Sequence, residues 1–183
     1  DQGAGTEVAP FGGAVQNEVS SPGCRHPDAV RPGLYRHPLR QTRPRPNVKA
    51  HNSSLRQAAD RIIAKQGVYE VLLVNRDGYI TEGSRSNFFA IKGNALITPP
   101  SSDVLEGVTR SIVIDLARSR GVTCHEDTIA QDSVKSLTGA FITGTSPGVL
   151  PICAIEDVPL PSIPNITRDI MKSYNDLIFE NLL

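Results

Sequence analysis

Residues 68–100 read VYEVLLVNRDGYITEGSRSNFFAIKGNALITPP, and this stretch decides which fold the chain can adopt. Within it, runs rich in Val, Ile, Leu and Phe alternate with the turn-forming groups Arg76-Asp77-Gly78 and Gly93-Asn94. Short apolar runs separated by such groups are typical of consecutive antiparallel strands. The stretch therefore predicts a meander built from VYEVLLVN, YITEGS, NFFAIKG and ALITPP.

Helices are predicted on both sides of this meander. Before it, apolar residues recur at helical spacing from Leu55 and stop at Gly67. After it, a second helix is predicted over residues 108–120, with Gly121 just past its end. A third helix, striped with apolar residues, is predicted to begin near Pro164.

Residues 1–47 differ from the rest of the chain. They contain seven of the fourteen prolines and six of the fifteen glycines, and they show no sustained apolar period. Segments of this composition seldom pack into a core. We therefore expect a linker here, or the remnant of a missing N-terminal domain. One mixed α/β domain follows over residues 48–183, in which antiparallel strands are flanked by helices.

Charge and cysteine content narrow the classes of partner. Nineteen basic side chains balance nineteen acidic ones, so no overall field would attract the chain to nucleic acid or to an anionic membrane. No apolar run approaches the length of a membrane span. The three cysteines are widely spaced and odd in number, which argues against a disulfide scaffold and favours reduced thiols. We expect neither a nucleic-acid nor a membrane partner, and a cytoplasmic location.

Common catalytic signatures are absent from the sequence, including a Walker loop, a GxSxG elbow and HExxH. The histidines and cysteines lack the spacing of metal ligands, so we predict no metal site. What remains is an ordered set of segments: PNVKAHN, ITEGSRSNFF, ITPPSSDVLEGVTR and FITGTSPGVLP.

In this order, the EGSxSN, LxGxTR and TGT elements resemble the class IV (fold type IV) aminotransferase family of pyridoxal-phosphate enzymes. The family includes branched-chain and D-amino-acid aminotransferases and aminodeoxychorismate lyases. The resemblance runs from about Pro46 to the C-terminus. It implies the family's C-terminal large domain, which has the D-amino-acid aminotransferase-like fold.

The resemblance makes Lys49 the catalytic lysine that binds pyridoxal 5′-phosphate covalently. This cofactor needs an amine to hold its aldehyde as an imine, and the same amine then shuttles a proton. The sequence has five lysines, and the usual fate of a lysine is the solvated surface. Lys49 precedes a predicted helix, whose positive dipole end disfavours an ammonium and so favours the neutral amine that the chemistry requires.

The resemblance also implies how the rest of the cofactor is held. Glu82 would face the pyridine nitrogen and keep the ring protonated, so that the ring accepts electrons from the substrate. The backbone N–H groups of Val108 and Thr109 would bind the phosphate at the start of a helix, where unpaired donors and the helix dipole favour an anion. Thr145 and Ser146 would reach the phosphate and the substrate carboxylate.

Ser86 and Asn87 would position the ring or the pair of strands that carries it. All seven residues also have an ordinary structural interpretation, as a surface acid, a cap or a turn residue. For Ser86 and Asn87 this interpretation is nearly as good as the functional one.

The implied reaction is transamination of an amino acid, of the branched-chain or D type, with a 2-oxo acid, by a homodimer. A lyase of the aminodeoxychorismate type would use the same anchors and eliminate pyruvate. A truncated, catalytically silent domain would only fold or bind a partner. The chain departs from the family pattern after Lys49, where KAHNSSL lacks the usual aromatic residue, and after Thr145, where Ser146-Pro147-Gly148 replaces small residues and an acid. Both departures concern substrate specificity.

Overall fold

Three α-helices and eleven strands form the described part of the chain, which comprises residues 32–36, 53–161 and 163–180 of a computed structural model. The helices are α1 (Ser53–Gln66), α2 (Val108–Ser119) and α3 (Asn165–Glu180). The strands up to α2 are β1 (Pro32–Arg36), β2 (Glu70–Val74), β3 (Tyr79–Gly83), β4 (Asn87–Lys92) and β5 (Ala95–Thr98). Those after it are β6 (Cys124–Glu126), β7 (Ile129–Ala130), β8 (Gly139–Gly144), β9 (Gly148–Pro151), β10 (Ala154–Ile155) and β11 (Val158–Pro159). Two short 3-10 helices, η1 (Ser101–Asp103) and η2 (Gln131–Ser136), complete the set.

The predicted meander is present as β2 to β5, and the fold class is confirmed as mixed α/β with antiparallel strands and flanking helices. The turns lie where the sequence predicts them, because Gly78 and Gly93 adopt φ of 84° and 61°, a region that costs glycine little. Gly121 likewise ends α2 with φ of 68°. The segment VTCHEDTI, residues 122–129, contributes to two short strands, β6 and β7.

The main sheet is organised around β4. This strand pairs antiparallel with β3, β5 and β8, and β8 pairs in turn with β9. The β4–β8 register places Phe89 opposite Phe141 and Asn87 opposite Thr143. At the other end of the sheet, β1 runs parallel to β2. Strand β1 thus adds five residues of the predicted linker segment to the sheet.

Both faces of β4 are buried. Phe88 and Ala90 point into one hydrophobic cluster, whereas Phe89 and Ile91 point into a second cluster that contains residues of α2 and α3. The rings of Phe89 and Phe141 stack with centroids 4.9 Å apart. A strand covered on both faces reads as a continuous apolar run, which is how the sequence NFFAI appears.

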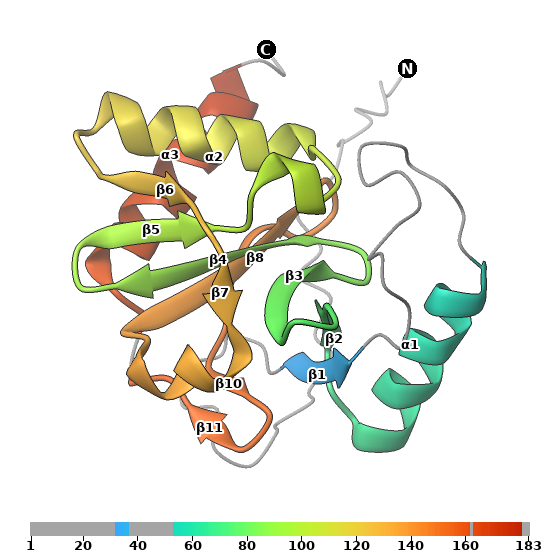
Figure 1. Cartoon of the computed structure of the whole chain (residues 1–183). Coiled ribbons are helices and arrows are strands. Elements are labelled where there is room, and N and C mark those ends of the chain that lie inside the picture. Colours follow the sequence, from blue (N-terminus) through green and yellow to red (C-terminus); the bar gives the residue numbers. More distant parts are fainter. Residues whose placement is uncertain (1–31, 37–52, 162, 181–183) are drawn as a thin grey trace, which may run out of the picture.

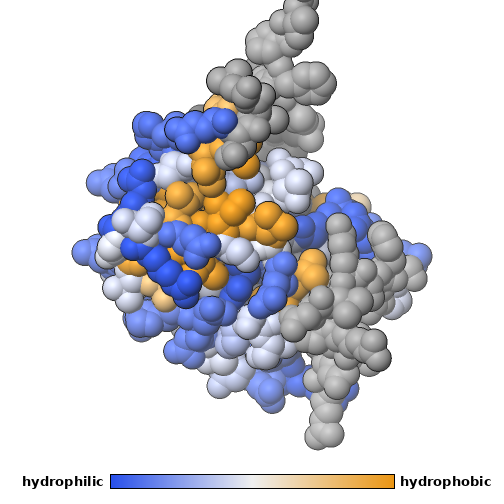
Figure 2. Space-filling model, turned by 90° about the horizontal axis from the view of Figure 1, so that it is seen from above, coloured by the Kyte–Doolittle hydropathy of each residue, from blue (hydrophilic) through white to orange (hydrophobic). Residues whose placement is uncertain are grey.

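Helices α2 and α3 cover one face of this part of the sheet, and α1 lies beside β1 and β2 at the opposite end (Figure 1). Viewed from the side of α2 and α3, the surface shows hydrophobic residues grouped among polar ones (Figure 2). Val108 and Phe179 are the most exposed large hydrophobic side chains of the described residues, at 76% and 69%. Within the described part of the chain, none of the helices combines the length and apolarity that a membrane span requires.

The state of the cysteines differs from the expectation of reduced thiols. Cys124 has a free thiol, but Cys153 is disulfide-bonded. The prediction that all three thiols are reduced is therefore wrong, because sequence spacing cannot show which cysteines approach each other in the folded chain.

Candidate active site

A cavity of about 640 Å³ opens beside the ends of β3 and β8 and the start of α2. Seven of the eight predicted cofactor-contacting residues line it: Glu82, Ser86, Asn87, Val108, Thr109, Thr145 and Ser146. These residues come from three segments that are far apart in the sequence. Lys49, the eighth, lies outside the described residues.

Strand pairing places the first of these segments, residues 82–87, next to β8. Glu82 on β3 pairs with Asn87 on β4, and Asn87 pairs with Thr143 on β8. A tight turn links β3 to β4, in which the Gly83 N–H donates to the Ser86 carbonyl at 2.7 Å. Three neighbouring strands therefore present polar side chains at one end of the sheet, where the cavity lies.

Glu82 and Asn87 also hold the loop that leads into α2. The Leu105 N–H donates to Glu82 Oε2 at 3.1 Å, and Asn87 Nδ2 donates to the Leu105 carbonyl at 2.7 Å. A methyl group on Gly107 would come within 2.3 Å of Asn87 Oδ1, so only glycine fits at this point of the loop. The two side chains thereby fix the place where α2 begins, and this contact accounts for Asn87 without any ligand.

The start of α2 is arranged as a site for an anion. Its N-cap residue Gly107 is extended, with φ of −73° and ψ of 140°, and no side chain of the described residues caps the helix. The first N–H groups of a helix have no partner within the helix, so those of Val108 and Thr109 remain available beside the cavity. Such groups, together with the helix dipole, attract phosphate or carboxylate.

The residues present fit a phosphorylated ligand. Thr143 is fully buried and lines the cavity, yet its Oγ1 has no hydrogen-bond partner among the described residues. Leaving a buried hydroxyl unpaired costs about 1–3 kcal/mol, so a ligand that pairs with it would be favoured. The hydroxyls of Thr145 and Ser146 and the α2 N–H groups add donors, and Glu82, only 1% exposed, adds a carboxylate to the lining of the same cavity.

Several residues that line the cavity were not predicted. They include Glu70 at the start of β2, Arg56 on α1, and Ser84 and Arg85 in the turn after β3. Arg85 forms an ion pair with Asp60 of α1. The sequence did contain a signal for Glu70, since it is an acid inside the apolar run of residues 68–74.

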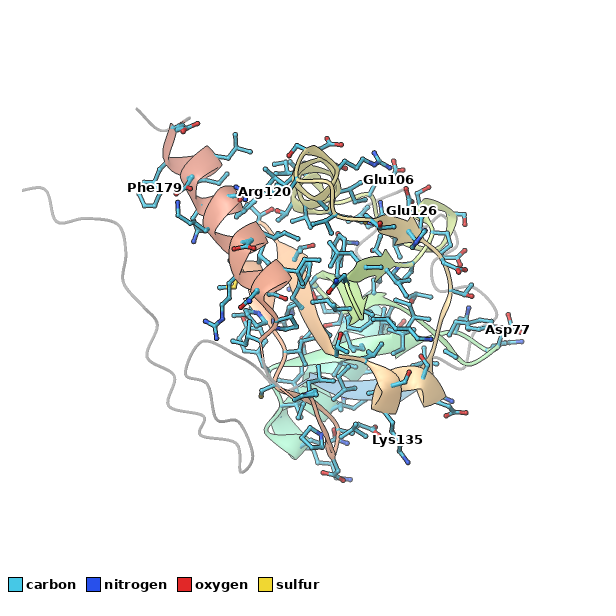
Figure 3. The ribbon with its side chains drawn as sticks, turned by 90° about the vertical axis from the view of Figure 1, so that its left-hand side faces the viewer. Asp77, Glu106, Arg120, Glu126, Lys135 and Phe179 are labelled. Atoms are coloured by element: carbon cyan, nitrogen blue, oxygen red, sulfur yellow. The ribbon has the colours of Figure 1, made fainter. Side chains whose placement is uncertain are left out.

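An ion pair between the buried Arg110 and the partly exposed Glu126 secures α2 outside the cavity. Arg110 is 3% exposed and its Nη2 donates to the Pro99 carbonyl at 2.9 Å and to Glu126 Oε2 at 2.8 Å. Figure 3 shows Glu126 next to α2. The hydrogen bond from Arg110 holds the pKa of the Glu126 carboxyl below its usual value, an effect that partial burial opposes.

Glu126→Gln is expected to lower the free energy of unfolding at pH 7 by about 1–2 kcal/mol, after allowance for solvent at the half-exposed carboxylate. Because the folded state lowers the pKa, the contribution is complete above the ordinary value of 4.5 and is lost as the pH falls below it. Urea unfolding of the wild type and the variant at several pH values measures the difference. A difference that stays constant down to pH 3 would contradict this account.

The chain matches the family model described as amino-transferase class IV over residues 19–155. It is 32% identical over 114 residues to the branched-chain-amino-acid aminotransferase of Pseudomonas aeruginosa, which covers 61% of this chain and 37% of the relative. It is 36% identical over 112 residues to the probable branched-chain-amino-acid aminotransferase of Aquifex aeolicus, covering 59% and 36%. The aligned segment thus spans little more than a third of these relatives.

Solved structures agree with the sequence matches. The branched-chain aminotransferase of Thermoproteus uzoniensis, crystallised with norvaline, superposes with a TM-score of 0.75 at 28% identity, over 82% of this chain and 52% of that one. The branched-chain amino acid aminotransferase of Thermobaculum terrenum in its PLP form gives 0.73 at 26%, over 83% and 52%. A putative 4-amino-4-deoxychorismate lyase of Legionella pneumophila gives 0.75 at 21%, over 81% and 56%, and shares the fold.

The chain therefore spans about half the length of these solved structures. The family model covers most of the chain, and the motifs that define the resemblance meet at one cavity. This chain belongs to the class IV aminotransferase family.

Proposed function

We propose that the cavity binds pyridoxal 5′-phosphate and that the chain takes part in transferring an amino group from an amino acid to a 2-oxo acid. The observation that carries the proposal is that seven residues assigned to the cofactor from three distant segments line one cavity. When bound, the cofactor supplies an aldehyde that takes up the substrate amine and a ring that accepts electrons from the substrate Cα.

The chain's own residues divide the remaining work. The N–H groups of Val108 and Thr109, with Thr145 and Ser146, hold the phosphate. The Glu82 carboxylate holds a proton at the ring nitrogen, and its burial strengthens this interaction because the surroundings have a low dielectric constant. The Nζ of Lys49 holds the cofactor and moves the substrate Cα proton. Asn87 keeps α2 in place through the Leu105 carbonyl.

Branched-chain amino acids are the substrates that the comparisons favour, since the Pseudomonas, Aquifex and Thermoproteus relatives carry that name. The aminodeoxychorismate lyase is similar in fold only, so it adds no support for elimination of pyruvate. D-amino acids are the second substrate class to test. Incubating the cofactor-loaded chain with leucine or D-alanine and identifying the 2-oxo acid released distinguishes the two.

We propose that the chain forms a homodimer. The ground is that the hydrophobic residues Val108 and Phe179 are exposed, and exposed apolar surface favours association. Figure 3 shows Phe179 near the end of α3, away from the sheet. The even balance of charges supports a chain without a nucleic-acid partner. A cytoplasmic location stays a prediction, and the disulfide at Cys153 removes the argument from reduced thiols.

Titration of the 183-residue chain with pyridoxal 5′-phosphate and with pyridoxal tests the cofactor proposal. We expect the phosphate to improve affinity at least about tenfold, since charge-assisted hydrogen bonds contribute about 1.5–3 kcal/mol. Thr145→Val should reduce this preference, whereas Thr128→Val, at an exposed position outside the cavity, should not. Equal affinity for both compounds would show that the start of α2 does not hold a phosphate.

A further inference from the structure

Glu70 is an acid in a place where the strand would favour an apolar residue. It begins β2, whose other four residues are buried hydrophobic residues, and it is only 4% exposed. Burying a charged group is costly unless it is well hydrogen-bonded. The buried Glu70 carboxylate therefore needs hydrogen-bond donors around it to offset the cost of its burial.

The Glu70 carboxylate accepts four hydrogen bonds. Oε1 accepts from the Val71 N–H at 2.8 Å and from Ser84 Oγ at 2.6 Å. Oε2 accepts from the Arg85 N–H at 3.2 Å and from Ser86 Oγ at 3.1 Å. Three of the four donors belong to residues 84–86, so the carboxylate mainly serves this turn rather than its own strand.

The turn of residues 84–86 positions Glu82 and Asn87 at the cavity, because it connects β3, which ends one residue after Glu82, to β4, which begins at Asn87. The backbone of the turn is also bonded to β2, with the Ser84 N–H donating to the Val71 carbonyl at 2.9 Å. A methyl group on Gly83 would come within 2.1 Å of Ser86 Oγ and 3.2 Å of Glu70 Oε2. The carboxylate and the turn are thus packed without spare room.

We propose that Glu70 is a positioning residue for the cofactor site, a role that rests on the function proposed above. Its carboxylate anchors the 84–86 turn and thereby fixes the Glu82–Asn87 pair, on which both the ring contact and the start of α2 depend. Glu70 acts through the turn, and its own oxygens are occupied by the four donors.

Glu70→Gln tests this role, because glutamine has the same shape but can accept hydrogen bonds with one oxygen only. The amide group that replaces Oε2 would face the Arg85 N–H and the Ser86 hydroxyl. We expect hydrogen exchange of the Arg85 amide to accelerate about ten- to a hundredfold and the affinity for pyridoxal 5′-phosphate to fall about tenfold. The visible circular dichroism of the bound cofactor, which reports its fixed orientation, should weaken.

Ile155→Val is the matched control, since Ile155 is 1% exposed, lies in the hydrophobic core and does not line the cavity. It should lower the melting temperature while leaving the Arg85 exchange and the cofactor affinity unchanged. Wild-type exchange of Arg85 in Glu70→Gln, or faster exchange with unchanged cofactor affinity, would overturn the proposal.

Two further measurements keep the test decisive. If Glu70→Gln does not fold, Ser84→Ala removes one donor and keeps the carboxylate, and we expect exchange of the Arg85 amide to rise about threefold to tenfold. Exchange equal to that of Ile155→Val would then overturn the anchoring role. Failure of the wild type to bind the cofactor would refute the proposed function, and Arg85 exchange would still decide whether Glu70 anchors the turn.

Discussion

Glu82→Gln is expected to slow amino-group transfer about a hundredfold while leaving cofactor binding measurable. The negative charge of Glu82 matters most when the ring has accepted the substrate's electrons, so its loss affects the transition state more than the bound ground state. A charge-assisted hydrogen bond contributes up to about 3 kcal/mol, which corresponds to about a hundredfold in rate. Glutamine retains the shape and can still accept the Leu105 N–H that Glu82 Oε2 accepts at 3.1 Å.

The measurement is the rate of 2-oxo acid release from leucine by the cofactor-loaded protein in a single turnover. Glu180→Gln is the matched control, because it makes the same chemical change at an exposed residue of α3 outside the cavity. Its rate should equal that of the wild type. A wild-type rate for Glu82→Gln as well would mean that Glu82 serves only to hold the Leu105 loop.

The local structure could be predicted from the sequence because local patterns determine it. Gly78, Gly93 and Gly121 supply the positive φ that their turns require, and each was predicted from its neighbours alone. Strand pairing is different. The contact of Phe89 with Phe141 depends on the register of two strands that are far apart in the chain, and one sequence does not contain that information.

Because strand pairing cannot be read from one sequence, some features of the fold and of the site were missed. Within VTCHEDTI, residues 122–129, β6 pairs with β5 and β7 pairs with β3, so the two ends of this segment pair with different strands. Glu70 could be recognised as unusual in an apolar run, yet its partners in the 84–86 turn follow only from the pairing of β2 with β3. The prediction that seven residues share one site came from the family resemblance and not from spacing.

The role of Asn87 also required the structure. Its side chain was expected to position the ring or the strand pair, which stays a prediction, and the structure adds that it donates to the Leu105 carbonyl at 2.7 Å. The need for glycine at position 107 follows from the same contact. The EGSxSN and LxGxTR elements are thus in direct contact, because Asn87 of the first holds the loop at Leu105 and Gly107 of the second.

Lys49→Ala is expected to abolish covalent attachment of the cofactor altogether, since an alanine side chain has no amine. The remaining contacts, at the start of α2 and at Thr145 and Ser146, should still bind the phosphate, so pyridoxal 5′-phosphate would bind reversibly and with lower affinity. This variant therefore distinguishes the contribution of the lysine to cofactor binding from that of the hydrogen-bond donors that line the cavity. Lys65→Ala, on α1 and outside the cavity, is the matched control.

The most direct test of the account is to locate the covalent label after wild-type protein has been incubated with pyridoxal 5′-phosphate and reduced with borohydride. Peptide mapping by mass spectrometry should find one pyridoxyl group per chain, at Lys49, and Lys65→Ala should give the same map. A label at any of the other four lysines in place of Lys49, or an equal yield of label from Lys49→Ala, would contradict the assignment of this chain's cofactor site.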